Sequence, residues 1–164
     1  MNRTTFTIKK RNFIKAALAL TCSAALLISP GSTRGDDSGS LVGVWRVTRH
    51  GMDCASGQLF NSFPALMTFH QDGTLHGDAV GPGSTAAEGT AEHGVWTRNG
   101  KDYSFRFISY GWDANGQLEG RAEITANLQL NGPNSFVYAA SVCFFGADGT
   151  PFGCHCARAE GTRF

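Results

Sequence analysis

Hydrophobic and polar residues alternate along much of the chain, most clearly over 117–130. In that segment the apolar and small side chains fall at even positions and the polar ones at odd positions. A period of two sustained over this length predicts a β-strand with one face in a core and one in water. The same criteria predict eight strands and no helix, at residues 41–49, 64–71, 74–80, 92–98, 102–112, 117–130, 135–145 and 151–160.

Glycine recurs between these strands at positions typical of hairpin turns. Because glycine tolerates positive φ, such pairs favour tight reversals of the chain. They are Asp72-Gly73, Asn99-Gly100, Asn115-Gly116 and Asp148-Gly149. Consecutive antiparallel strands form a meander, and closing the meander removes its exposed edges. We therefore predict an all-β fold, an eight-stranded antiparallel up-and-down (meander) β-barrel.

The alternation also predicts the register at individual turns. At the first of these turns, a type I turn with a glycine bulge pairs Phe69 with Leu75 and keeps apolar side chains on one face. At the third, a two-residue loop pairs Phe107 with Ile124 and has the same effect.

Two long connections, 50–63 and 81–91, fall at the same end of the predicted barrel. The other end has only tight turns. This asymmetry predicts a cup that a ligand enters between the long loops.

A short motif on the first strand carries a family resemblance. Gly43-Val44-Trp45 is similar to the G-x-W of the lipocalin and calycin barrels, and a long loop after the first strand is also a lipocalin trait. In that family an arginine near the end of the barrel lies over the tryptophan and closes the floor. The resemblance implies that Arg158 has this role, with Gly43 and Trp45 as the other floor residues.

The resemblance covers about residues 41–160 and implies an exported, bacterial-type lipocalin-like protein. The chain departs from the family by having no C-terminal helix and no threonine-aspartate-tyrosine motif. Avidin-type barrels share the short meander and the Asp-Gly turns, so biotin-like ligands are an alternative.

Strand parity selects the side chains that face the interior. The predicted ligand-binding residues among them are Arg49, Met67, Phe69, Trp96, Tyr103, Phe105, Phe107 and Tyr138. Small inward residues leave room for a pocket, although side chains can also fill an eight-stranded barrel completely. An inward Arg49 could hold a carboxylate, or the inward Glu92 could neutralise it.

Charge separates the first 35 residues from the rest. Six of the 14 Lys+Arg lie there with no acid, leaving eight bases against 13 acids from residue 36 onward. The uncharged run 16–28 follows the basic residues and is short for a membrane span. We predict an export signal at 1–35, Sec or Tat-like, before a single domain at 36–164. The acidic domain predicts no nucleic-acid binding and no stable membrane insertion after cleavage.

Four cysteines follow the signal segment, and an even count in an exported protein favours two disulfides. Of three possible connectivities, the expected strand positions favour Cys54 with Cys156 and Cys143 with Cys154. A metal or redox site around Cys154-His155-Cys156 is the alternative. It is less favoured, because adjacent strand residues point to opposite faces.

The sequence contains no hydrolase, metalloprotease, P-loop or dinucleotide motif. We predict no catalytic residue, metal or cofactor, and an exported protein, periplasmic or extracellular, that binds a small hydrophobic or amphipathic molecule in the cup. One alternative is an isomerase or cyclase acting on an oxygenated lipid or isoprenoid, with Arg49, Glu92 or Tyr103 as candidates. Another is a structural module with a filled core.

Overall fold

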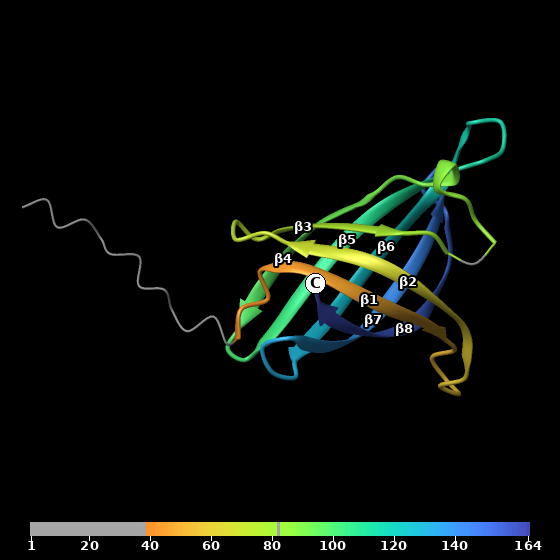
Figure 1. Ribbon diagram of the computed structural model, residues 1–164. Coiled ribbons are helices and arrows are strands. Elements are labelled where there is room, and N and C mark those ends of the chain that lie inside the picture. The colour runs from red at the N-terminus through yellow and green to blue at the C-terminus, as the bar shows by residue number, and fades with distance from the viewer. Residues whose placement is uncertain (1–38, 82) are drawn as a thin grey trace, which may run out of the picture. The chain divides into compact units, whose positions relative to one another are not determined.

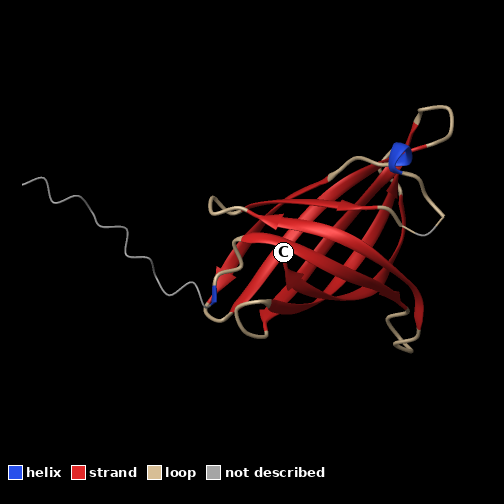
Figure 2. Ribbon diagram, in the orientation of Figure 1, coloured by secondary structure: helices blue, strands red, loops and turns tan. Residues whose placement is uncertain are grey.

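A computed structural model describes residues 39–81 and 83–164 (Figure 1). They form eight antiparallel strands in sequence order, closed into one barrel (Figure 2). The strands are β1 (Gly43–Met52), β2 (Leu59–Phe69), β3 (Thr74–Ala79), β4 (Glu92–Asn99), β5 (Asp102–Trp112), β6 (Leu118–Leu130), β7 (Ser135–Gly146) and β8 (Pro151–Arg163). The predicted all-β barrel is confirmed. The predicted export signal at 1–35 lies outside the described residues.

Helix is almost absent from the described part of the chain. One 3₁₀ helix, η2 (Ala86–Glu88), lies in the connection between β3 and β4. Within residues 39–81 and 83–164, no helix is long and apolar enough to cross a membrane.

The two ends of the barrel differ in their connections. The turns after β2, β4 and β6 lie at one end, on the left in Figure 1. The connections after β1, β3, β5 and β7 lie at the other end and include the segment that carries η2. We call these the closed end and the open end.

Large aromatic side chains fill the closed half of the barrel. Trp45, Phe69 and Phe136 are fully buried, and the rings of Trp45 and Phe136 have centroids 4.8 Å apart. Phe69 packs edge-on against Trp96 and Phe105. Burying one such side chain stabilises the fold by roughly 1.5–3 kcal/mol, so this half is a true core.

An arginine does seal the floor, but it is Arg163. Its guanidinium carbon lies 4.3 Å from the Trp45 ring centroid. The same guanidinium donates hydrogen bonds to the carbonyl oxygens of Ser40 at 2.6 Å, Val42 at 2.8 Å and Pro133 at 2.9 Å. One side chain therefore joins the last strand to the β6–β7 turn and to the segment that precedes β1.

The floor role expected for Arg158 is wrong. Arg158 is exposed and lies opposite His50, near the open end. β8 continues three residues beyond the predicted end at residue 160, which places Arg163 directly opposite Trp45. Arg158 also has the opposite parity to the inward residues of β8, so its side chain faces outward.

Both predicted register pairs are confirmed, Phe69 with Leu75 and Phe107 with Ile124. The expected two-residue loop at Asn115-Gly116 is wrong, because the amide of Gly116 bonds to the carbonyl of Asp113 in a three-residue loop. A β-bulge at Gly111/Trp112 inserts the compensating residue. The bulge restores the pairing that keeps the apolar face inward.

The first connection is shorter than the predicted loop 50–63. β1 runs to Met52 and β2 begins at Leu59. Pro64 lies within β2, where it faces β1, and β2 pairs with β3 only from Ala65 onward. A proline is tolerated at this point because β2 has no second partner there.

Two disulfides hold the open end together, in the predicted pairing. Cys54 in the β1–β2 loop is bonded to Cys156, and Cys143 is bonded to Cys154 directly opposite it. A bulge between Phe144 and Phe145 compensates for the bulged Asp148-Gly149 turn and brings the second pair into register. These bonds indicate a non-reducing, exported environment.

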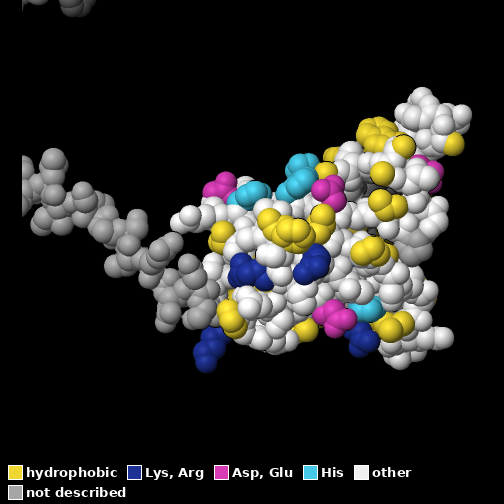
Figure 3. Space-filling view, in the orientation of Figure 1, with side chains coloured by type: hydrophobic (Ala, Val, Ile, Leu, Met, Phe, Trp, Pro, Cys, Tyr) yellow, Lys and Arg dark blue, Asp and Glu magenta, His cyan; other side chains and the backbone are white. Residues whose placement is uncertain are grey.

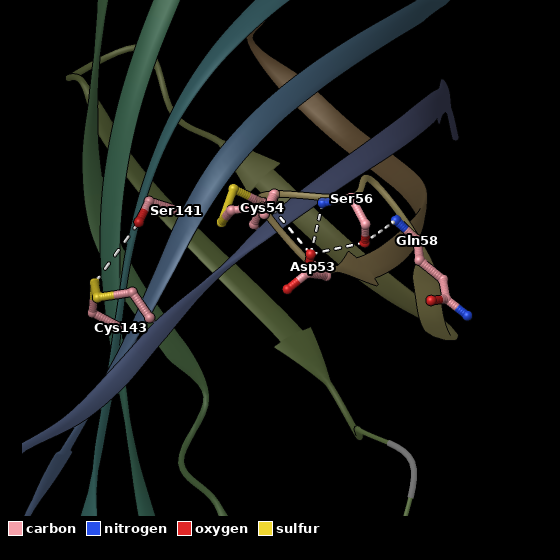
Figure 4. The surroundings of a disulfide bond; sticks show 9 residues. Asp53, Cys54, Ser56, Gln58, Ser141 and Cys143 are labelled. Atoms are coloured by element: carbon pink, nitrogen blue, oxygen red, sulfur yellow. Dashed lines mark hydrogen bonds between the residues drawn. A yellow bond between two sulfur atoms is a disulfide. The ribbon is translucent and has the colours of Figure 1, made fainter.

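The β1–β2 loop has its own polar support, shown in Figure 4. The Asp53 carboxylate accepts hydrogen bonds from the Ser56 amide at 2.7 Å and the Ser56 hydroxyl at 2.8 Å. These bonds lower the pKa of Asp53 below its ordinary value. The backbone amide of Gln58 in turn donates a hydrogen bond to the Ser56 hydroxyl. These bonds support the loop on both sides of Cys54.

The outer surface mixes side-chain types. On the face drawn in Figure 3, arginine, acidic, histidine and hydrophobic side chains are interspersed. His70 and His93 are exposed, and His76 and His93 face each other across β3 and β4.

Candidate functional site

The open half of the barrel contains a cavity of about 1030 Å³. Its wall combines small inward residues with aromatic ones. The small side chains of Ala122 and Ala140 leave space in the cavity, and the rings of Phe107 and Tyr138 form part of its wall. The barrel is thus filled at one end and hollow at the other, at the upper limit of the usual size for small-molecule sites.

The predicted ligand-binding residues divide between the two halves. Arg49, Phe107 and Tyr138 line the cavity. The other five belong to or pack against the closed half, which corrects their expected position in a cup: Met67, Phe69, Trp96, Tyr103 and Phe105. Parity gave the correct face for these side chains, but it carries no information on their depth along the barrel axis.

An ion pair crosses the bottom of the cavity. The two terminal nitrogens of Arg49 donate to the two carboxylate oxygens of Glu92, at 2.5 and 2.7 Å. Each residue is only 7% exposed. Bidentate pairing of this kind is the strongest arrangement for arginine and carboxylate. The sequence left open whether Glu92 neutralises Arg49, and the structure pairs them.

Burial opposes the charge on Arg49, but its partners outweigh that effect. The hydrogen bonds to Glu92 and the negative charge of its carboxylate raise the pKa of Arg49 above its ordinary value. Burial also raises the pKa of the Tyr138 phenol, and the Arg49 charge offsets part of that rise. Arg49 therefore remains a cation and Tyr138 remains a neutral phenol at neutral pH.

Glu92 reaches Arg49 because a glycine lies opposite it. Gly77 pairs with Glu92 across β3 and β4, and a Cβ at Gly77 would collide with the Glu92 carboxylate. This pair is also the last one between the two strands, since β3 has no β4 partner beyond Gly77. The carboxylate thus lies where the wall begins to open.

Arg49 has one polar atom that the protein leaves unused. Its Nε is buried and has no hydrogen-bond partner in the described part of the chain. The guanidinium carbon lies 5.2 Å from the centroid of the Phe107 ring, so one face of the group is covered by an aromatic surface. A buried donor without a partner is costly, so the protein itself does not fully satisfy this guanidinium.

Aromatic side chains surround the cavity mouth. His155 lies between Phe60 and Phe144, with ring centroids 5.2 and 5.3 Å away. Phe152, at the tip of the β7–β8 hairpin, is 72% exposed. No role was predicted from the sequence for Phe60 or Phe152. Phe60 lies in the predicted loop 50–63, where parity assigns no face, whereas in the structure it belongs to β2 as the extra residue of a bulge opposite Gly51/Met52.

The alternative metal or redox site at 154–156 is not supported. Cys154 and Cys156 are both in disulfides, and His155 packs between aromatic rings. Burial lowers the pKa of His155, which favours the neutral imidazole in this setting. Among the described residues, no group of three or more histidine, cysteine or acidic side chains could hold a metal ion.

A second depression lies on the outside of the barrel. It is an open groove across β1, β2 and β3, where Arg46, Leu66 and Asp78 point away from the core. The groove has no buried polar group, so the interior cavity is the better candidate site.

Searches against family models, curated proteins and solved structures found no match for this chain. The function is therefore inferred from the barrel and its cavity.

Proposed function

We propose that this protein is an exported, lipocalin-like binder that takes one small apolar or amphipathic molecule into the open half of the barrel. The observation that carries the proposal is the cavity of about 1030 Å³, whose inner wall has alanine and aromatic side chains and one buried ion pair at its base. Apolar walls with few polar groups are typical of small-molecule sites.

The disulfides support a periplasmic or extracellular location for the mature protein. They also suit a binding cup, since they fix the β1–β2 loop and the β7–β8 hairpin beside the mouth. A fixed mouth reduces the conformational entropy that is lost when a ligand binds.

Catalysis by the same barrel is the second candidate, since a charged pair lies beside a phenol in the cavity. Of the three residues considered for an isomerase or cyclase, Tyr103 lies at the closed end and donates its hydroxyl to Gly39 at 2.6 Å. Glu92 has both oxygens engaged by Arg49, which leaves it poorly placed as a proton acceptor. Binding is therefore favoured over turnover.

A neutral fluorescent probe, N-phenyl-1-naphthylamine, tests the proposal. We expect saturable fluorescence enhancement with one site per chain, and its loss in the Ala140→Phe variant, because Ala140 lines the cavity. Ala139→Phe is the matched control, since Ala139 is the neighbouring outward residue of β7 and is exposed. Equal enhancement in the two variants, or none in the wild type, would refute binding in the cup.

A further inference from the structure

We propose that the ligand presents an uncharged hydrogen-bond acceptor, such as an alcohol, ketone, ester or amide, to the base of the cavity, and not a carboxylate. This inference rests on the proposed function and names the chemical class of ligand for the same cavity. It follows from three features of the lining.

The first feature is that Arg49, at the base of the cavity, is already neutralised by Glu92. Glu92 engages both terminal nitrogens of Arg49, and the pair is almost fully buried. A ligand carboxylate approaching Arg49 would be desolvated beside the carboxylate of Glu92. Like charges in a poorly solvated site repel strongly, so an anionic head group loses more than it gains.

The second feature is the hydrogen-bonding capacity that remains. A guanidinium has five N–H donors, and the two bonds to Glu92 use one on each terminal nitrogen. The Nε donor has no partner within the described residues but is buried from solvent, so the donors left for a ligand are those on the terminal nitrogens. An uncharged acceptor can bond to a remaining donor of Arg49 without adding charge to the pair.

The third feature is the charge of the whole lining. Four acidic residues line the cavity against two arginines. The acids are Glu88, Glu92, Asp113 and Glu119, and the second arginine is Arg121. Arg121 bonds to Glu123 at 2.7 Å and stacks on Phe145, so it is not free to attract an anion. Acidic side chains therefore outnumber basic ones at the cavity and its mouth, which disfavours the entry of anions.

A matched series of ten-carbon compounds, decan-1-ol, decanamide and decanoate, tests the head-group preference. Each displaces N-phenyl-1-naphthylamine from the wild-type protein at neutral pH. We expect the alcohol and the amide to bind about tenfold or more tightly than decanoate, the size of effect given by about one unfavourable charge contact.

The variant Glu92→Gln tests the cause. Removing the carboxylate frees the Arg49 charge, so decanoate should gain affinity relative to decan-1-ol. Asp78→Asn is the control, because Asp78 is exposed on the outside of the barrel and is not among the residues that line the cavity. It should leave the order of the series unchanged.

The outcomes separate the two proposals. If the probe itself does not bind the wild type, the proposed function fails. If the probe binds, and decanoate displaces it with the same affinity as decan-1-ol, then the proposed binding function is retained and the head-group inference is overturned. The wild-type series gives this answer even if Glu92→Gln does not fold. If that variant folds and keeps the wild-type order, the role assigned to Glu92 is wrong.

Discussion

The guanidinium of Arg163 stacks on the indole of Trp45, with 4.3 Å between the guanidinium carbon and the ring centroid. Three carbonyl oxygens accept hydrogen bonds from the same group. The contact closes the barrel at the end opposite the cavity, so it supports the filled half on which the cup is built.

Replacing Arg163 should therefore destabilise the fold without touching the cavity. We expect Arg163→Ala to lower the free energy of unfolding by about 3 kcal/mol, from the lost cation–π contact and charged hydrogen bonds. Urea unfolding measures the change. Arg158→Ala is the control, because Arg158 is exposed on the same strand, and its effect should stay within about 0.5 kcal/mol. Equal losses in the two variants would show that the stacking is unimportant.

The buried pair predicts an asymmetry between single and double substitutions. Glu92→Ala leaves the Arg49 cation buried without its partner, and should cost about 3–5 kcal/mol of unfolding free energy. Arg49→Met combined with Glu92→Leu removes both charges and should recover most of that loss. Guanidinium chloride unfolding of the three proteins measures the coupling. A double variant as unstable as Glu92→Ala would contradict this account.

The two disulfides should differ in their contribution to stability. Cys54 and Cys156 are 102 residues apart in sequence, whereas Cys143 and Cys154 are 11 apart. Loop entropy gives about 5 kcal/mol for the long bridge and about 3 kcal/mol for the short one. Thermal unfolding of the two double serine variants compares them. We expect the lower melting temperature for Cys54→Ser with Cys156→Ser, and the reverse order would argue that loop entropy does not dominate.

Acid should weaken the turns. The carboxylates of Asp72 and Asp148 accept hydrogen bonds from Thr74 and Thr150, and these bonds lower the pKa of both aspartates. Because the folded pKa is depressed, the stability they contribute is present above the ordinary aspartate pKa. It is lost as the pH falls below about 4, through the folded value.

Urea midpoints measured between neutral pH and pH ~3 test this pH dependence. Asp72→Asn with Asp148→Asn should flatten the acid limb of the profile, while Glu119→Gln, whose carboxylate makes none of these turn bonds, should not. An unchanged acid limb in the aspartate variant would assign the acid sensitivity to other groups.

Sequence alone gave the strand order, the closed barrel and the disulfide pairing. The alternation of apolar and polar residues determines which face of a strand points inward, and glycine determines where the chain reverses. Both effects act over a few residues. The turns at Asn115-Gly116 and Asp148-Gly149 show how strong the facing constraint is. Each adds a residue in the loop, and a bulge nearby removes the resulting shift.

The candidate site was only partly accessible from sequence. Arg49, Phe107 and Tyr138 were identified as inward and do line the cavity. Tyr103 and Phe105 were equally inward by parity, but they are buried in the closed half. Depth along the barrel axis depends on how strands stagger around a closed sheet, and no single strand encodes it.

The sequence by itself determined an all-β meander with one apolar face, because periodicity and turn chemistry are local. The tertiary structure decided which arginine meets Trp45, where the core stops and the cavity begins, and that Glu92 neutralises Arg49. These outcomes depend on contacts between strands far apart in the chain. Only closure of the barrel brings β8 beside β1, and β4 within reach of a side chain from β1.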